Sequence, residues 1–325
     1  MSGRIECVRA TLKTWFERSA WNLSLVVVQE SSKTMEAAIK LLEHALAELG
    51  LEPGLASSAL ALEGTGNRSV LIRTDGESLV VRMDGVGIDG LVDREREHIH
   101  ARLAAERGLG PDLVFCDAAK GLLVTRFVEG RRFDALERPF GQGVIERLVQ
   151  TLARLRDVQG FGDVMNPWEK IAGYLDQAGY SDPGHDDALG AVWPGLVDLR
   201  ANAEFEAADL VPSHIDPVPE NLLDLGDRVV MLDWEYSALS HPLWDLAYFA
   251  TEAGLSRDER AILLATSGVA CERRRFGLWM MLAMAVSLAW CLLRLTHETD
   301  DKVLWTKEVA RRRHLLARSL SEVSD

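Results

Sequence analysis

The segment that most constrains this chain is His214–Glu235, which reads HIDPVPENLLDLGDRVVMLDWE. Two short apolar runs, Leu222–Leu225 and Val229–Leu232, flank a turn that contains glycine, and this pattern predicts a β-hairpin. Polar side chains stand just before the first run and just after the second. Because antiparallel pairing brings the outer ends of a hairpin side by side, we expect these side chains to converge.

The converging groups are two carboxylates and a carboxamide, from Asp216, Asn221 and Asp233. Mg²⁺ prefers oxygen ligands and usually combines one or two protein carboxylates with substrate phosphates. We interpret Asn221 and Asp233 as metal ligands and Asp216 as the base that accepts the proton of an attacking hydroxyl. An acidic turn without chemistry is the alternative. His-x-Asp-x4-Asn, then a hairpin and Asp-Trp-Glu, is far more restrictive than such a turn requires.

The sequence HIDPVPENLL followed by LDWEY resembles the choline/ethanolamine kinase branch of the aminoglycoside-phosphotransferase-like kinases, and Ser240–Ala247 resembles the segment that follows there. This resemblance implies an α+β, two-lobed, protein-kinase-like fold, with a small N-terminal lobe built on an antiparallel sheet and a larger, mainly helical C-terminal lobe. It also implies transfer of the γ-phosphoryl group of ATP to the hydroxyl of a small molecule. In this likeness Asp216 is the base, Asp245 braces the catalytic loop, and His214 is structural.

Composition limits the partners and the compartment. Hydrophobic residues make up 47% of the 325 residues and charged residues 26%, which is ordinary for a soluble globular protein. The formal net charge of -14 argues against nucleic acid or an anionic membrane as a partner and slightly favours a cationic substrate. The four cysteines form no Cys-x-x-Cys pair, so we expect free thiols in a reducing cytoplasm. A homodimer is left open.

The length predicts two lobes. Residues 1–34 do not resemble the rest and are interpreted as an N-terminal extension of unknown role. Residues 35–129, which begin with a helical pattern at 36–49, are assigned to the nucleotide-binding lobe, and residues 130–325 to the catalytic and acceptor-binding lobe.

The N-terminal lobe is predicted to contain a sheet of about five strands, at 58–62, 69–73, 79–83, 113–116 and 122–127. The first turn contains Gly64, Gly66 and Asn67, whose backbone N–H groups can approach the phosphates. The kinase resemblance implies that Arg82, on the third strand, holds the α- and β-phosphates and that Glu97, on the helix predicted at 91–107, is its partner.

Two further features lie between this sheet and the second lobe. Residues 127–130 are the predicted hinge, where Phe127 and Glu129 would meet adenine through the backbone. The glycines of 85–90 fit the G-x-G-x-x-G pattern of a dinucleotide site, but Asp89 and Asp93 would crowd a pyrophosphate there. We therefore interpret 85–90 as a flexible loop. The pair His98 and His100 is interpreted as part of a solvated helix face.

The second lobe is predicted to be helical outside the hairpin. Helical periodicity covers 144–158, 167–178, 186–208 with a break at Pro194, 243–253 and 257–267. Residues 276–293 carry no charge, which is borderline for a membrane span by length. Because no second span exists and a charged amphipathic helix follows, we interpret this segment as a buried core helix.

A cationic acceptor is usually held by aromatic faces and carboxylates. The candidates for such a pocket are Glu235, Tyr236, Trp244 and Trp290. Core packing is an equal alternative for the two tryptophans. The chain departs from the family pattern at Ser287, where the first tryptophan of Trp-x-x-Trp would stand, and at His241, where Asp or Asn would be expected.

These observations predict an ATP- and Mg²⁺-dependent kinase for choline, ethanolamine or a related amino alcohol. A kinase for an aminoglycoside, thiamine, methylthioribose or another sugar-like alcohol is the first alternative. A nucleotide-binding module without catalysis and a dinucleotide-dependent oxidoreductase that uses the glycines of 85–90 are the others.

Overall fold

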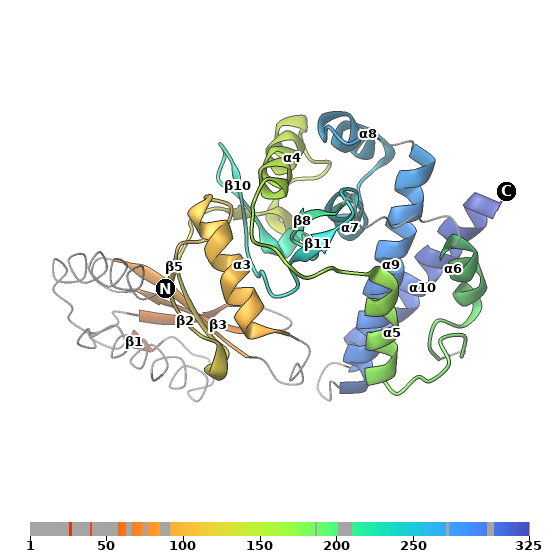
Figure 1. Ribbon diagram of the computed structural model, residues 1–325, viewed down its shortest axis with the longest axis horizontal. Coiled ribbons are helices and arrows are strands. Elements are labelled where there is room, and N and C mark those ends of the chain that lie inside the picture. Colours follow the sequence, from red (N-terminus) through yellow and green to blue (C-terminus); the bar gives the residue numbers. More distant parts are fainter. Residues whose placement is uncertain are drawn as a thin grey trace. The chain divides into compact units, whose positions relative to one another are not determined.

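The computed structural model describes most of the chain (Figure 1). The described residues are 26–27, 40, 58–62, 67–73, 77–84, 92–185, 187–200, 210–270, 273–297 and 302–324. The chain divides into two compact units, Met1–Glu129 and Gly130–Asp325. Several predicted features lie outside the described residues: nearly all of the N-terminal extension and of the helix at 36–49, Gly64 and Gly66, and the glycines of 85–90.

The N-terminal unit contains a six-stranded sheet in the order β1-β2-β3-β4-β6-β5. Only the β1–β2 pair is parallel, and the other pairs are antiparallel, as the resemblance implies. The five predicted strands are confirmed. The strands are β1 (Val26–Val27), β2 (Ser58–Leu62), β3 (Arg68–Arg73), β4 (Ser78–Met83), β5 (Leu113–Asp117) and β6 (Leu122–Arg126).

Helix α3 (Arg94–Glu106) connects β4 to β5. It begins at Asp93, whose side chain accepts the backbone N–H of Arg96, an N-cap that satisfies one of the free donors of the first turn. The expectation of a solvated face at His98 and His100 is wrong, because both side chains are buried, with exposed fractions of 5% and 2%. The helix packs against β5, and its buried residues include charged and polar ones, Glu97, His98 and His100, beside Ala101 and Ala104. The buried face is therefore wider than the charged sequence suggests.

The C-terminal unit is mainly helical, as predicted. Its helices are α4 (Gln142–Arg156), α5 (Pro167–Gln177), α6 (Trp193–Arg200), α7 (Trp244–Glu252), α8 (Arg257–Thr266), α9 (Arg273–His297) and α10 (Lys302–Ser324). The helix predicted at 186–208 with a break at Pro194 begins only at Trp193, after a 3₁₀ turn at Gly190–Val192, and residues 201–208 lie outside the described residues. Pro194 lies in the first turn of α6, where the backbone N–H that proline lacks would have no partner within the helix.

Helix α9 is the central helix of this unit and packs against α5, α7 and α10; α9 and α10 lie side by side in Figure 1. Its segment Arg273–Thr296 is long and apolar enough to cross a membrane, with a mean hydropathy of 2.0. However, 83% of that apolar window is buried inside the fold. Contact with neighbouring helices therefore accounts for its composition, which agrees with the predicted core helix.

The predicted hairpin is confirmed by antiparallel pairing of β9 (Leu222–Asp224) with β10 (Val229–Met231), in which Met231 lies opposite Leu222. The strand β7 (Arg131–Arg132) pairs with β9 on its other side. A second small sheet joins β8 (Val211–Ser213) to β11 (Ala238–Ser240). These pairs hold both ends of the His214–Glu235 segment against the helices.

Candidate active site

The side chains of Asp216 and Asn221 are hydrogen-bonded to each other at the entrance to the hairpin. Asn221 Nδ2 donates to Asp216 Oδ2 at 3.2 Å and to the backbone oxygen of Asp216 at 3.1 Å. A carboxamide can donate only through its nitrogen, so these bonds fix which way the amide faces. Asn221 Oδ1 is thereby directed away from Asp216 and is available as a ligand oxygen.

The two ends of the hairpin meet, as the sequence predicts. The backbone N–H of Leu232 donates to the backbone oxygen of Asn221 at 2.8 Å, which places Asp233 one residue from that bond. Asp233 has φ 61°, in the left-handed region that aspartate tolerates better than most residues. A carboxylate oxygen of Asp233 and one of Glu235 lie within 4.8 Å of each other.

This donor set fits a magnesium ion bound together with substrate phosphates. It offers hard oxygen ligands only, one carboxamide oxygen and one carboxylate, and leaves the remaining positions for phosphate oxygens and water. The assignment of Asn221 and Asp233 as the metal ligands stays a prediction, and their placement is compatible with it.

Asp245 holds the loop that carries Asp216. Its Oδ2 accepts the backbone N–H of His214 at 2.8 Å, and its Oδ1 accepts that of Ile215 at 2.9 Å. Ile215 has φ 74°, an uncommon conformation for a β-branched residue that costs about 1–3 kcal/mol. The carboxylate of Asp245 stabilises this bend, and the bend directs the next residue, Asp216, toward Asn221. Burial raises the pKa of Asp245 to about 6, although its backbone hydrogen bonds act in the opposite direction.

His214 is fully buried beneath the hairpin, in agreement with a structural role. Its Nε2 donates to the backbone oxygen of Leu232 at 2.8 Å, and its ring contacts the ring of Trp234 edge-on at 4.8 Å. Burial lowers its pKa to about 4, so the imidazole is neutral near pH 7. His214 thus connects the loop before the hairpin to the strand that ends at Asp233.

The carboxylate of Asp216 has an unusual electrostatic environment. Burial raises its pKa to about 7, and the negative charges of Glu252 and Glu235 add to this effect. The positive charge of Lys170 and a hydrogen bond from Tyr248 partly offset it. A carboxylate whose pKa lies near neutrality can accept a proton at the working pH and release it afterwards.

Four residues near Asp216 were missed by the sequence interpretation: Lys170 and Tyr174 on α5, and Tyr248 and Glu252 on α7. The hydroxyls of Tyr174 and Tyr236 are hydrogen-bonded, and burial raises the pKa of both phenols. Tyr248 and Glu252 lie four residues apart, on one face of α7. Only this spacing could have indicated the pair, and nothing in the sequence of α5 indicated its contribution.

The two tryptophans that the sequence offered either as acceptor ligands or as core residues both make packing contacts. Trp244 is 0% exposed, and its Nε1 donates to the backbone oxygen of Ile215 at 3.0 Å. A fully buried indole offers no face to a ligand, so Trp244 supports the loop that carries Asp216. Trp290 contacts Trp305 of α10 edge-on at 5.1 Å, beside the guanidinium of Arg294. The full burial of Trp244 favours the core-packing alternative for that residue, and the role of the half-buried Trp290 in acceptor binding stays a prediction.

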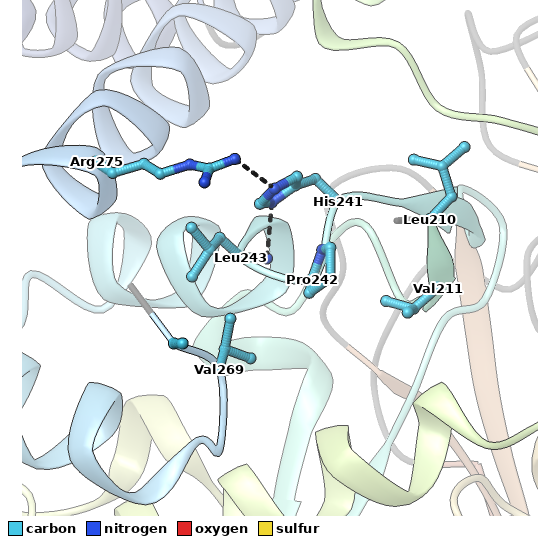
Figure 2. A pocket seen from close by; sticks show the side chains of 8 residues that line it. Leu210, Val211, His241, Pro242, Leu243, Val269 and Arg275 are labelled. Carbon is cyan, nitrogen blue, oxygen red and sulfur yellow. Dashed lines mark hydrogen bonds between the residues drawn. The ribbon is translucent and has the colours of Figure 1, made fainter. Parts of the chain in front are cut away.

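His241, which stands where an Asp or Asn would be expected, makes a turn hydrogen bond before α7 of the kind that Asp and Asn side chains make. Its Nδ1 accepts the backbone N–H of Leu243 at 3.1 Å, the two-residue bond that short polar side chains make in turns. The ring stacks on Trp279 at 4.3 Å. His241 also borders a hollow of about 410 Å³ with Arg275 and mostly aliphatic neighbours, shown in Figure 2, which contains none of the predicted site residues.

In the N-terminal unit, the expected ion pair of Arg82 with Glu97 is present and buried, with side-chain exposures of 8% and 0%. Arg94, which the sequence did not indicate, donates to Glu97 at 2.7 Å and to Asn67 at 3.0 Å. Burial alone would raise the pKa of Glu97, but the two guanidinium groups outweigh it and lower the pKa. This network connects β4, α3 and Asn67 of the predicted glycine turn.

The predicted hinge residues lie at the end of the N-terminal unit. Phe127 is 38% exposed, and its backbone N–H donates to the backbone oxygen of Ser78 at 2.8 Å. Glu129 is exposed. Their roles in adenine binding, and those of Arg82, Glu97 and Asn67 in phosphate binding, stay predictions.

Comparison with known proteins agrees with this geometry. The family model described as "Phosphotransferase enzyme family" matches residues 59–277, which include both the β2–β6 sheet and the hairpin. The chain belongs to this phosphotransferase family. Protein LicA from two Haemophilus influenzae sources is 29% identical over 212 residues and 30% identical over 206 residues. These matches cover 63% and 62% of this chain; this chain spans 61% of the first relative and 75% of the second.

Several solved structures share the fold of this chain. A choline/ethanolamine kinase family protein from Mesorhizobium loti is 25% identical, with a TM-score of 0.68, covering 89% of this chain and 99% of that one. Choline kinase LicA from Streptococcus pneumoniae is 20% identical, with a TM-score of 0.71 and coverages of 87% and 98%. A LicA structure in complex with AMP is 18% identical, with a TM-score of 0.67 and the same coverages. The expected resemblance and the expected protein-kinase-like fold are confirmed.

Proposed function

We propose that this phosphotransferase is a cytoplasmic, ATP- and Mg²⁺-dependent kinase that phosphorylates the hydroxyl of choline, ethanolamine or a related amino alcohol. The observation that carries the proposal is the joint placement of Asp216, Asn221 and Asp233. The carboxyl of Asp216, whose pKa is raised to about 7, is hydrogen-bonded to Asn221, and a backbone bond from Leu232 to Asn221 brings Asp233 to the same end of the hairpin. Carboxylate and carboxamide oxygens suit a magnesium nucleotide. The AMP bound to a related LicA structure supports a nucleotide as the donor.

In this proposal the residues of the chain have different roles in the phosphoryl transfer. Asp216 orients the acceptor hydroxyl and takes its proton as the oxygen attacks the γ-phosphorus and the bond to the bridging oxygen of ADP breaks. A bound Mg²⁺ would neutralise the charge that develops on the phosphate oxygens. Because phosphoryl transfer passes through a loose transition state, the placement of Asp216 by Asp245 contributes more than its strength as a base.

The surroundings of Asp216 support a cationic acceptor. The ammonium of Lys170 lies 4.1 Å from the ring centroid of Tyr236 and 5.3 Å from that of Tyr174, so these phenol rings already face a positive charge. Cation–π contacts contribute about 0.5–2 kcal/mol each. The carboxylates of Glu235 and of Glu252, the latter paired with Arg312, also lie near Asp216. A positively charged amino alcohol matches both properties better than a neutral sugar.

The test is a panel of alcohols incubated with ATP that carries a labelled γ-phosphate, with and without Mg²⁺. The panel contains choline, ethanolamine, an aminoglycoside, thiamine and methylthioribose. We expect labelled product from choline or ethanolamine only, and no product after chelation of the metal. Product from a neutral sugar alone would contradict the assignment of the acceptor. The absence of both product and slow ATP hydrolysis would instead identify a binding module without catalysis.

A further inference from the structure

Helix α10 contributes a side chain that is paired with a carboxylate near Asp216. Arg312 of α10 forms a two-point ion pair with Glu252 of α7, with Nη1 2.6 Å from Oε1 and Nη2 2.8 Å from Oε2. The side chains are only 16% and 9% exposed. A bidentate pair that is largely shielded from water holds both groups in one geometry, unlike a single-point pair on the surface.

Glu252 lies next to the reacting centre. It stands one helical turn after Tyr248, whose hydroxyl is hydrogen-bonded to Asp216. Its charge repels that of Asp216 more strongly than Glu235 does. Any group that fixes Glu252 or neutralises it therefore acts on the place where the acceptor must lie.

Among the described residues of the C-terminal unit, carboxylates outnumber basic groups around this place. The carboxylates are Asp216, Glu235 and Glu252, with Asp233 beside Glu235 and Glu308 beside Arg312, and the basic groups facing them are Lys170 and Arg312. Removing Arg312 would add one net negative charge to this set. An added negative charge favours an acceptor that carries an additional positive charge.

We propose that Arg312 is a positioning residue that fixes Glu252 and offsets one negative charge near Asp216, so that the enzyme prefers acceptors with a single positive charge to dications. This inference rests on the proposed function and adds a determinant of acceptor selectivity from a helix that carries none of the predicted site residues. One additional unit charge a few ångströms from the acceptor changes the ratio of kcat/KM for a dication to kcat/KM for a monocation by about tenfold.

The experiment compares kcat/KM for choline with kcat/KM for a choline analogue in which one N-methyl group carries a second quaternary ammonium. In Arg312→Gln we expect the ratio of analogue to choline to rise about tenfold. The change should appear in KM for the acceptors, while KM for ATP stays constant. In the double variant Glu252→Gln/Arg312→Gln both charges are gone, and the ratio should return to that of the wild type.

Two controls separate charge from damage to the fold. Lys307→Gln removes an exposed positive charge from the same helix and should leave the ratio unchanged. Arg312→Lys keeps the charge and should keep the preference for choline. Calorimetry measures binding of choline and of the analogue without turnover and so repeats the comparison. If Arg312→Gln does not fold, the double variant and Arg312→Lys test the role of Arg312 in acceptor preference.

The possible outcomes are distinct. An unchanged ratio in folded Arg312→Gln, or a double variant that fails to restore it, overturns the role of Arg312 but leaves the kinase assignment intact. If the wild-type protein phosphorylates neither choline nor ethanolamine, the proposed function fails and this inference fails with it.

Discussion

Asn221 donates its side-chain amide to the carboxylate of Asp216 at 3.2 Å, across the five residues of the loop that leads into the hairpin. This hydrogen bond fixes two groups that have different tasks in the proposed mechanism. It orients the carboxylate proposed to accept a proton, and it leaves the amide oxygen of the predicted metal ligand facing away from Asp216. In that mechanism the geometry of the transfer depends on this pair and on the backbone that holds it.

Replacing Asp216 by Asn should abolish proton acceptance and keep the shape of the loop. We expect kcat to fall by about 10²–10⁴-fold, the usual contribution of a general base. Nucleotide affinity, measured by fluorescence titration, should be little changed. Asp227→Asn, in the exposed turn of the same hairpin, is the matched control and should have wild-type kcat. Full activity in Asp216→Asn would exclude the proposed role.

Replacing Asp245 by Asn should loosen the catalytic loop. One of the two backbone N–H groups, of His214 or Ile215, would then face an amide nitrogen and lose its acceptor. A buried donor without an acceptor costs about 1–3 kcal/mol, so the free energy of unfolding in urea should fall by that amount. The value of kcat should fall too, because Asp216 follows Ile215 directly. Asp258→Asn, on the exposed face of α8, should change neither quantity, and an equally stable Asp245→Asn would show that the bracing is unimportant.

Replacing Glu97 by Gln should weaken the contact to ATP more than the contact to the acceptor. Arg82 and Arg94 would lose the carboxylate that holds both guanidinium groups. Hydrogen bonds to charged groups contribute about 1.5–3 kcal/mol, so we expect KM for ATP to rise at least about tenfold. Steady-state kinetics with each substrate varied in turn provide the measurement. Glu95→Gln, an exposed position in the first turn of α3, serves as the control, and an equal rise in both KM values would argue against a role in nucleotide binding.

The buried neutral His214 should make stability depend on pH. Its pKa is lowered from 6.5 to about 4 in the folded protein, so between these values the unfolded chain binds the additional proton. The free energy of unfolding contributed by this group is therefore fully present above pH 6.5. It is lost as the pH falls, by about 1.4 kcal/mol per pH unit and about 3 kcal/mol in all.

The raised pKa values of Asp216 and Asp245 have the opposite effect in the same range. The informative quantity is thus the difference between the wild type and His214→Gln, which stays neutral and can still donate to Leu232. Urea unfolding at several pH values should show this difference shrinking as the pH falls from 6.5 to 4. The exposed His185, replaced by Gln, is the control. A difference that does not depend on pH would mean that His214 is not held neutral.

The hairpin and its three polar residues were predictable because the signal is local. The spacing of Asp216, Asn221 and Asp233 around two short apolar runs fixes which groups meet once the strands pair. The pair of Arg82 and Glu97 was found through the kinase resemblance and not from a local pattern. Trp244 and Trp290 were ambiguous, since an aromatic residue on an apolar helix reads the same in a core and in a pocket.

The sequence by itself determined the family, the fold and the position of the catalytic loop, because hydrophobic periodicity, turn residues and short motifs depend on neighbours along the chain. Only the tertiary structure decided what surrounds Asp216. Lys170, Tyr174, Glu252 and Arg312 come from three helices, α5, α7 and α10, that are far apart in sequence and are held together by packing around α9. The charge and pKa of a buried carboxylate depend on distances through space, and these exist only after the helices have packed.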